Sequence, residues 1–178
     1  DVARIAGVHL KRLNVGGGFA AHRTGAAPDL EAVFDRIHRA TKQGFGANEP
    51  VLVCEPGRAM VADSFTLATR VKALPPDGSI FLNDGTYGGL AEARDMHMTD
   101  RVRVISPTGT PRTGAAQARV VYGPTCDSID RLPDPLDLPA DVTEGDYVLF
   151  AGMGAYSLAV GTAFNGYGVT DLILVSDL

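Results

Sequence analysis

Residues 1–60 read as strand, glycine-rich turn, helix and strand, and this order constrains the fold more than any other feature. Val8–Val15 has the pattern of a strand and runs directly into three consecutive glycines, Gly16–Gly18. Apolar residues recur at helical spacing over Pro28–Gln43. Val51–Cys54 is a short apolar run between two prolines, which is typical of a strand buried on both faces of a parallel sheet. These residues therefore predict one βαβ unit.

A single βαβ unit does not bury its own sheet. A parallel strand pair needs neighbouring strands at both edges and helices on both faces, and residues 1–60 supply one helix. We therefore expect the remaining strands to come before Asp1, so that the chain is one part of a longer protein.

After Arg58 the pattern changes to short alternating or apolar runs without a long helix. The expected strands of this second part are Thr66–Leu74, Ile80–Leu82, Arg101–Ile105, Gln117–Tyr122, Tyr147–Phe150 and Leu172–Val175. Asp127–Glu144 is rich in proline and aspartate, which predicts a surface loop. The chain is thus expected to be an α/β part followed by an antiparallel β part, with the boundary between residues 58 and 66.

Charge and composition narrow the classes of partner. The net charge is -5 and no cluster of lysine and arginine is visible, so a nucleic-acid partner is not expected. No apolar run approaches the roughly 18 residues that a membrane-spanning helix needs. Cys54 and Cys126 do not make a disulfide framework, which favours the cytoplasm. The four histidines lack the spacing of metal ligands, so no metal site is expected.

Two motifs follow the predicted strands of the βαβ unit. Gly16–Gly18 lets backbone N–H groups approach an anion, although a plain tight turn is an equally good interpretation. Glu55 ends the second strand, where a buried carboxylate needs a cation or a protonated nitrogen. Gly57 and Arg58 could hold a phosphate, with Arg58 supplying its charge and a backbone N–H. The simpler alternative is a local ion pair between Glu55 and Arg58.

Three further turns carry reactive or aromatic side chains. Cys126 and Asp127 follow a predicted strand in a Gly-Pro turn, where a thiol can donate a proton and a carboxylate can bind an ammonium group. The simpler alternative is a small buried cysteine with Asp127 capping the turn. Tyr156 follows the turn Gly152–Gly154 and could either donate to a phosphate or simply pack. Phe164 stands in a Phe-Asn-Gly turn.

Five segments of the chain stand in the order in which they occur in a known family. They are Leu13–Phe19, Glu55–Arg58, Asn83–Gly88, Gly123–Ser128, and Met153–Tyr156 together with Phe164–Gly166. With them the chain resembles, over nearly its whole length, the alanine-racemase-like (fold-type III) decarboxylases that depend on pyridoxal phosphate. That family includes ornithine, lysine, diaminopimelate and arginine decarboxylases. The Cys-Asp pair resembles the ornithine and lysine enzymes more than the diaminopimelate enzymes, which usually carry glutamate after the cysteine.

The resemblance implies a cofactor site made by the first, second and fifth segments. Gly18, Gly57 and Arg58 would bind the phosphate of pyridoxal phosphate, and Tyr156 would add a hydroxyl donor. Glu55 would pair with the pyridine nitrogen and keep it protonated, so that the ring can accept the electrons left when CO₂ departs.

The resemblance also implies a substrate site shared between two subunits of a homodimer. Cys126 would help to return a proton to the decarboxylated carbon, and Asp127 would bind the distal amine of the substrate, both in the site of the other subunit. Phe164 would line the same pocket. Asp95 is the nearest match to a further acid that the family uses for the distal amine, although its surroundings differ from the family pattern.

The family fold is a (β/α)₈ barrel of the TIM type followed by an antiparallel β-sandwich or β-barrel domain. By resemblance, residues 1–62 would be the last part of the barrel and residues 63–178 the β domain, with the chain end free to return to the barrel. The family's Schiff-base lysine lies on its first barrel strand, and Lys11, Lys42 and Lys72 match no such motif. We therefore expect this chain to lack that lysine and the N-terminal half of the same protein to supply it.

The function implied by the resemblance is the decarboxylation of L-ornithine or L-lysine to putrescine or cadaverine, by a lyase of polyamine biosynthesis. The sequence leaves the choice among basic amino acids open. One alternative is a catalytically inactive homologue that regulates a partner by binding it, but such a protein has no chemical need for both Cys126 and Asp127. An amino-acid racemase is a third alternative, which the Cys-Asp turn disfavours.

Overall fold

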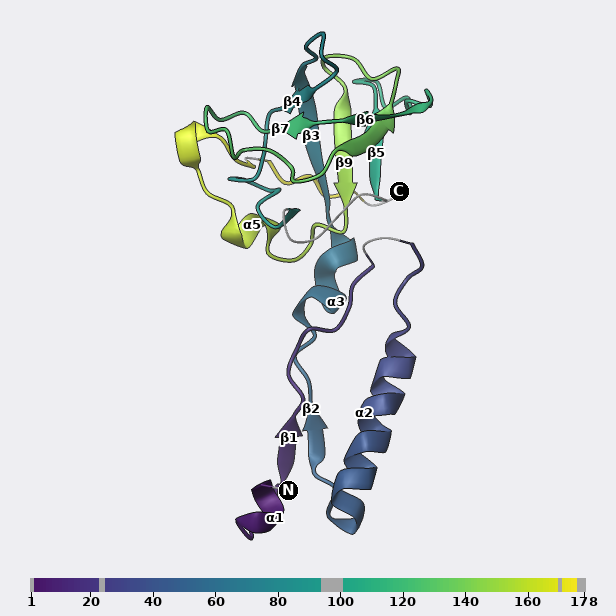
Figure 1. The fold of residues 1–178 in the computed structure, drawn as a ribbon, viewed down its shortest axis with the longest axis vertical. Helices are drawn as coiled ribbons and strands as arrows, with labels where there is room; N and C mark the ends of the chain where they lie inside the picture. The colour runs from purple at the N-terminus through teal and green to yellow at the C-terminus, as the bar shows by residue number, and fades with distance from the viewer. Residues whose placement is uncertain (1, 23–24, 94–100, 170, 176–178) are drawn as a thin grey trace.

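The computed structural model describes residues 2–22, 25–93, 101–169 and 171–175. The chain has a slender α/β part and a broader β part, which Figure 1 shows at the two ends of the long axis. The short helix α3 (Gly57–Val61) and the 3-10 turn η2 (Ala62–Ser64) lead from one part to the other. This connection carries Gly57 and Arg58, two of the expected site residues.

The α/β part confirms the predicted order of strand, turn, helix and strand. Strand β1 (Arg12–Asn14) pairs in parallel with β2 (Val51–Val53), and helix α2 (Leu30–Phe45), followed by the turn η1 (Gly46–Asn48), connects them. Asp29 caps α2 by accepting a hydrogen bond from the backbone N–H of Ala32 at 2.9 Å. Because the strands are parallel, the turns that follow them begin at the same edge of the sheet.

Two expectations for the α/β part are wrong. The first strand begins at Arg12 instead of Val8, and a short helix, α1 (Val2–Ile5), precedes it. The second strand is not buried on both faces, since Val51 is 66% and Val53 is 39% exposed. The physical reason is that β1 and β2 have no further strand beside them among the described residues.

The β part contains a five-stranded sheet in the order β5-β9-β3-β4-β7. Its strands are β3 (Thr66–Ala73), β4 (Ile80–Leu82), β5 (Val102–Ile105), β7 (Val121–Tyr122) and β9 (Tyr147–Ala151). β3 pairs antiparallel with β4 and β9, and β5 pairs antiparallel with β9. β4 and β7 pair in parallel, so the sheet is mixed and the prediction of an antiparallel part is wrong at this pair.

A second sheet consists of β6 (Ala116–Arg119) and β8 (Leu136–Pro139), which pair antiparallel. β8 lies within Asp127–Glu144, so the prediction of a surface loop is wrong for these 4 residues. Leu136 and Leu138 are buried while Asp137 between them is exposed, which is the alternation of a strand. The single strand predicted from residue 117 to residue 122 divides into β6 and β7, which belong to different sheets.

The two sheets share one hydrophobic core. Its largest fully buried apolar side chains are Phe150, Ile80, Leu82, Leu90, Leu138, Val71, Val104, Val121 and Val148. Every strand of the five-stranded sheet and β8 contribute to this set. Burial of apolar surface, worth about 25 cal/mol per Å², is therefore what holds the β part together.

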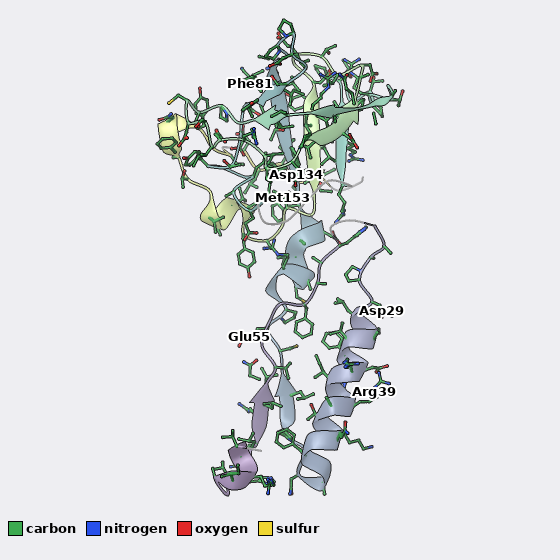
Figure 2. The ribbon with its side chains drawn as sticks, viewed as in Figure 1. Asp29, Arg39, Glu55, Phe81, Asp134 and Met153 are labelled. Carbon is green, nitrogen blue, oxygen red and sulfur yellow. The ribbon has the colours of Figure 1, made fainter. Side chains whose placement is uncertain are left out.

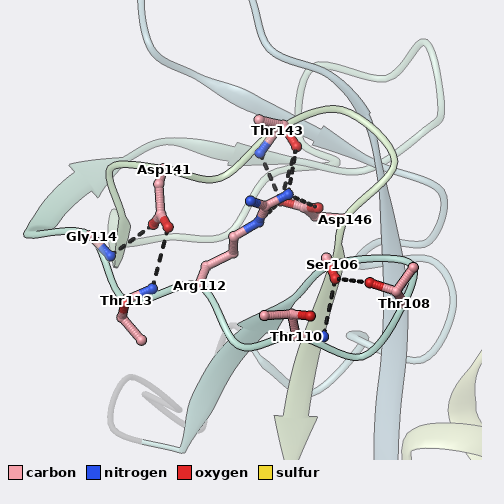
Figure 3. A network of polar contacts seen from close by, with 9 residues as sticks. All are labelled: Ser106, Thr108, Thr110, Arg112, Thr113, Gly114, Asp141, Thr143 and Asp146. Carbon is pink, nitrogen blue, oxygen red and sulfur yellow. Dashed lines mark hydrogen bonds and ion pairs between the residues drawn. The ribbon is translucent and has the colours of Figure 1, made fainter.

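A polar network ties two loops of the β part together (Figure 3). The carboxylate of Asp146 is fully buried and accepts two hydrogen bonds from the guanidinium of Arg112, each at 2.8 Å. The backbone N–H of Thr143 donates to the same carboxylate at 2.8 Å. Burial raises the pKa of Asp146, but the hydrogen bonds from Arg112 and Thr143 outweigh burial and hold that pKa below its ordinary value.

Among the described residues, the chain forms no further strand after β9. The short helix α5 (Ser157–Val160) and the turn η3 (Phe164–Gly166) follow β9. The expected strand Leu172–Val175 is wrong, because these residues form no strand and their side chains are exposed. No helix in the described ranges is long and apolar enough to cross a membrane.

Candidate functional site

The glycine turn and Glu55 lie together where the two parallel strands end (Figure 2). The backbone N–H of Glu55 donates to the carbonyl of Gly16 at 2.9 Å, and the side-chain amide of Asn14 donates to Glu55 Oε1 at 2.6 Å. A β-carbon at Gly17 would lie 2.7 Å from the backbone oxygen of Glu55, so only glycine fits there. Gly18 follows with a φ of 77°, and a β-carbon there would meet no atom within 4 Å. The turn thus presents open backbone beside an oriented carboxylate.

Arg58 and Tyr156 form the other half of this group. The guanidinium carbon of Arg58 lies 4.8 Å from the centroid of the Tyr156 ring. Arg58 also pairs with Glu92, with 2.6 Å between Nη2 and Oε2, so the alternative of a local ion pair with Glu55 is wrong. A β-carbon at Gly57 would lie 3.1 Å from the hydroxyl oxygen of Tyr156. The structure therefore brings Tyr156, predicted from a distant turn, against both Gly57 and Arg58.

The backbone of Tyr156 has a left-handed conformation, which is uncommon for a residue with a side chain. Its φ is 65°, in the left-handed region, which costs a residue with a side chain roughly 1 kcal/mol. The neighbouring carbonyl of Ala155 accepts a long hydrogen bond of 3.5 Å from Arg58 Nη1. We call Gly16–Gly18, Glu55, Gly57, Arg58 and Tyr156 the strand-end cluster.

A second group surrounds Cys126 and Asp127. The hydroxyl of Tyr87 donates to Asp127 Oδ2 at 2.5 Å, and the side-chain amide of Asn165 donates to Sγ of Cys126 at 3.5 Å. The rings of Tyr87 and Phe164 are tilted by 36°, with their centroids 4.6 Å apart. We call these five residues the thiol cluster. The structure thus brings together the three residues Cys126, Asp127 and Phe164 that the resemblance placed in one pocket.

The simpler interpretation of the Cys-Asp turn holds for one residue of the two. Cys126 is exposed, so the alternative of a buried cysteine is wrong. Asp127 does cap the turn, because its Oδ1 accepts from the backbone N–H of Ile129 at 3.0 Å. The hydrogen bond from Tyr87, followed by that from Ile129, holds the pKa of Asp127 below its ordinary value. The turn therefore combines an accessible thiol with a carboxylate that stays ionised.

A buried carboxylate, Asp130, fixes the two loops of the thiol cluster. Its Oδ1 accepts from the backbone N–H of Thr86 at 2.8 Å, and its Oδ2 accepts from the backbone N–H of Thr125 at 3.0 Å. Gly85 and Gly123 pack so closely against it that a β-carbon at either would overlap one of its oxygens. Because each threonine directly precedes a residue of the thiol cluster, Asp130 sets the spacing between the loops.

Asp84 is a second buried carboxylate, and it lies in the loop that carries Tyr87. It accepts from the backbone N–H groups of Gly85 and Gly89 at 2.9 and 2.8 Å. Burial raises the pKa of Asp84 above its ordinary value and outweighs these two hydrogen bonds, and the charge of Asp130 raises the pKa further. The Asp84 carboxylate therefore stabilises the fold of this loop through hydrogen bonds to its backbone.

Three residues of the site were not singled out by the sequence patterns. Tyr87 and Asn165 stand inside two of the five matching segments, and that was the available signal. Glu92 stands in no motif, so nothing in the sequence pointed to its ion pair with Arg58. Asp95, expected near the substrate amine, lies outside the described residues.

Two stretches of chain each reach both clusters. Residues 87–92 begin with Tyr87 of the thiol cluster and end with Glu92, the partner of Arg58. Residues 156–165 begin with Tyr156 of the strand-end cluster and end with Asn165 of the thiol cluster. Short covalent paths therefore join the two clusters within one chain.

Neither cluster lines the cavity of about 450 Å³ that lies against the outer strands of the β part. That cavity is bordered by residues of β5, β6 and β8, among them Arg103 and Asp137. The two halves of the strand-end cluster meet at Gly57, whose backbone N–H donates to the carbonyl of Glu55 at 2.9 Å. Among the described residues, no histidine, cysteine, aspartate and glutamate side chains gather in a group of three or more that could hold a metal ion.

Comparison with known families gives one match. Residues 29–154 match the family profile described as pyridoxal-dependent decarboxylase, C-terminal sheet domain. The chain is 32% identical over 177 residues to the ornithine decarboxylase of Schizosaccharomyces pombe. This match covers 94% of the chain and 39% of that protein. It is 30% identical over 182 residues to the ornithine decarboxylase of Cricetulus griseus, with the same coverage of 94% and 39%. The chain spans about 39% of the length of these curated relatives.

Solved structures show the same likeness. The arginine decarboxylase of Paramecium bursaria Chlorella virus bound to agmatine superposes with a TM-score of 0.75 at 30% identity, over 94% of this chain and 45% of that one. The lysine/ornithine decarboxylase of Vibrio vulnificus complexed with cadaverine superposes with a TM-score of 0.75 at 27% identity, over 96% of this chain and 47% of that one.

Proposed function

The chain belongs to the pyridoxal-dependent decarboxylases and carries their C-terminal sheet domain, and from this premise we propose that it is part of an enzyme that decarboxylates L-ornithine or L-lysine. The single observation that carries the proposal is the thiol cluster, in which an accessible thiol and an ionised carboxylate stand side by side in sequence. Ornithine decarboxylases and a lysine/ornithine decarboxylase among the similar proteins support this substrate class. The products would be CO₂ and a diamine, putrescine or cadaverine, for polyamine biosynthesis in the cytoplasm.

The strand-end cluster fits pyridoxal phosphate, the cofactor of the family. Arg58 offers positive charge and Tyr156 a hydroxyl donor for the phosphate, beside Gly57, where a β-carbon would crowd the tyrosine. Glu55 offers a carboxylate of which one oxygen is already held by Asn14. When bound, pyridoxal phosphate supplies a ring that accepts the electrons left behind by the departing CO₂.

Five residues of the strand-end cluster have a role in this proposal. The Glu55 carboxylate would accept a hydrogen bond from the protonated pyridine nitrogen and would keep that nitrogen charged. The backbone of Gly18 and Gly57 and the guanidinium of Arg58 would bind the phosphate, and the Tyr156 hydroxyl would donate to it. The contact between Arg58 and the Tyr156 ring holds these two proposed phosphate ligands next to each other, beside Gly57.

The residues of the thiol cluster act on the substrate in this proposal. The Cys126 thiol returns a proton to the carbon that has lost CO₂, and Asp127 binds the distal ammonium group of the diamino acid. Phe164 lines the apolar stem of the substrate. We place these three residues in the site of a second copy of the protein, so that the enzyme is a homodimer. Asp95, outside the described residues, is proposed as a further acid for the distal ammonium group.

The exposed strands of the α/β part support a proposal about the whole fold. Residues 1–62 would be the last part of a (β/α)₈ barrel, and residues 63–178 the β domain. Val51 and Val53 are exposed in the two-stranded sheet, whereas barrel strands have neighbours at both edges and helices outside. We place the lysine that carries the cofactor in the N-terminal half of the same protein.

The test is CO₂ release by the protein expressed from its complete reading frame. With pyridoxal phosphate present, carboxyl-labelled L-ornithine or L-lysine is expected to release labelled CO₂ faster than L-arginine does. Cys126→Ala is expected to lower kcat by roughly 100-fold, the size of a lost proton donor. Asp127→Ala is expected to raise KM by about 10-fold, the size of a lost contact to a charged group.

Ser128→Ala is the matched control, because Ser128 is the exposed neighbour of these two residues. Its kinetic constants are expected to equal those of the unaltered protein. Folded protein that binds pyridoxal phosphate but releases no CO₂ from any diamino acid would sink the proposal. That outcome would favour the alternative of an inactive homologue that regulates a partner.

A further inference from the structure

The segment Thr162–Gly166 is fastened to the backbone of Tyr87. The backbone N–H and the hydroxyl of Thr162 both donate to the carbonyl of Tyr87, at 2.7 and 3.0 Å. The hydroxyl of Thr162 also accepts from the backbone N–H of Phe164 at 3.2 Å, and the ring of Phe164 packs on the ring of Tyr87. These contacts hold the segment Thr162–Gly166 next to Tyr87, although Thr162 and Tyr87 lie 75 positions apart in the sequence.

Asn165 has a backbone conformation that places its amide on the thiol. Its φ and ψ are 53° and 21°, which asparagine tolerates better than other residues with side chains. The contacts of Thr162 and Phe164 on one side and the following Gly166 on the other hold this conformation. From there the side-chain amide donates to Cys126 Sγ at 3.5 Å. A left-handed backbone held by its neighbours beside a reactive group indicates that the orientation of the Asn165 amide is fixed by the fold.

Tyr87 acts on the neighbouring carboxylate in a similar way. Its hydroxyl donates to Oδ2 of Asp127 at 2.5 Å, while Oδ1 accepts from the backbone N–H of Ile129 at 3.0 Å. A carboxylate offers about four lone-pair directions. With one direction occupied on each oxygen, Asp127 is oriented and still has acceptor capacity for an ammonium group.

We propose that Tyr87 and Asn165 are positioning residues with separate roles. Tyr87 orients the Asp127 carboxylate for the distal ammonium group, and Asn165 orients the Cys126 thiol for proton delivery. This inference rests on the function proposed for Cys126 and Asp127. Neither positioning residue touches the reacting carbon; each acts through its hydrogen-bonded neighbour. Loss of the Tyr87 contact therefore changes substrate binding, and loss of the Asn165 contact changes turnover.

The variants are chosen to remove one hydrogen bond each. Tyr87→Phe removes the hydroxyl and keeps the ring that packs on Phe164. Asn165→Gly removes the amide and keeps the left-handed backbone, which glycine adopts without strain. Asn165→Asp keeps the size of the side chain but replaces the N–H donor by an oxygen. Tyr167→Phe is the matched control, since Tyr167 is an exposed tyrosine that directly follows η3.

Steady-state kinetics of the full-length enzyme with pyridoxal phosphate give the first readout. Tyr87→Phe is expected to raise KM for the diamino acid about 10-fold with kcat within about 3-fold, the size of one hydrogen bond to a charged group. Asn165→Gly and Asn165→Asp are expected to lower kcat about 10-fold with KM within about 3-fold. Tyr167→Phe is expected to change neither constant.

The rate of alkylation of Cys126 by iodoacetamide gives a second readout that needs no catalysis. Peptide mass spectrometry separates Cys126 from Cys54, which is also exposed. Both Asn165 variants are expected to change the alkylation rate of Cys126 by about 3-fold or more and to change how this rate depends on pH. Tyr87→Phe is expected to leave the rate and its pH dependence unchanged.

The outcomes separate this inference from the proposed function. The separation of roles would be overturned if Tyr87→Phe and Asn165→Gly changed KM and kcat in the same way. It would also be overturned if both Asn165 variants left the alkylation rate of Cys126 unchanged. Full activity of Asn165→Asp would overturn the role of the N–H donor. If the unaltered protein releases no CO₂ from any diamino acid, the proposed function fails, and the alkylation rates then decide the Asn165 contact by themselves.

Discussion

At the scale of single residues, the buried carboxylate of Asp146 is a charge that stabilises the β part. It is fully buried, and the partner Arg112 that keeps it ionised is partly exposed. Asp146→Asn is expected to lower the free energy of unfolding by roughly 3 kcal/mol at neutral pH, because the buried side chain loses its charge-assisted hydrogen bonds from Arg112 and places an N–H donor beside other donors. Urea unfolding followed by circular dichroism measures the change. Asp137→Asn, on the exposed face of β8, is the control and is expected to change stability by less than about 0.5 kcal/mol.

The same carboxylate fixes the direction of the pH dependence. The pKa of Asp146 in the fold lies below its ordinary value of 3.8. Its charge therefore stabilises the fold fully above the unfolded pKa, and this stabilisation is lost as the pH falls through the lower folded pKa. The stability difference between the unaltered protein and Asp146→Asn is expected to narrow as the pH is lowered from neutral to about 3. A difference that stays constant over this range would contradict the assignment.

The sequence predicted residues whose own side chains are reactive or charged in a local motif. It did not predict residues whose role depends on a contact with a distant residue. Cys126 and Asp127 are a reactive pair in a Gly-Pro turn, which is a local pattern. Asn165 meets Cys126 across 39 positions, and Glu92 meets Arg58 across 34. Such pairings depend on how strands are ordered in the sheet, and no local pattern encodes that order.

At the scale of elements, helix α2 depends on signals at its own ends. Asp29→Ala is expected to destabilise α2 by about 1 kcal/mol, because the backbone N–H of Ala32 loses its acceptor. Amide hydrogen exchange in the first turn of α2 measures the loss locally. Asp29→Asn retains a side-chain oxygen and is expected to exchange as the unaltered protein does. Equal exchange in the alanine and asparagine variants would contradict the role of the cap.

The elements that were predicted correctly are those with local signals. Helix α2 has apolar residues at helical spacing and a capping aspartate, and β3 has a long alternating run. β8 was missed because its alternation covers 4 residues beside prolines. The parallel pairing of β4 with β7 was missed because strand direction is set by the path of the intervening chain. Local patterns thus gave the elements, and the packing of the core decided their arrangement.

At the scale of the whole molecule, the slender α/β part leaves apolar surface exposed. Val51 and Val53 are exposed, and β1 and β2 have no strand beside them among the described residues. A sheet edge with apolar side chains pairs readily with other chains. The isolated chain is therefore expected to self-associate in sedimentation velocity, and replacing both valines with lysine is expected to reduce the association. A monodisperse monomer of the unaltered chain would contradict this expectation.

The two stretches that reach both clusters, residues 87–92 and residues 156–165, have a consequence for how ligands communicate. A ligand that orders either stretch at one end reduces the conformational entropy that a second ligand must still remove at the other end. In the proposed homodimer, where one chain would serve two active sites, these stretches would connect the cofactor residues of one active site with the substrate residues of the other.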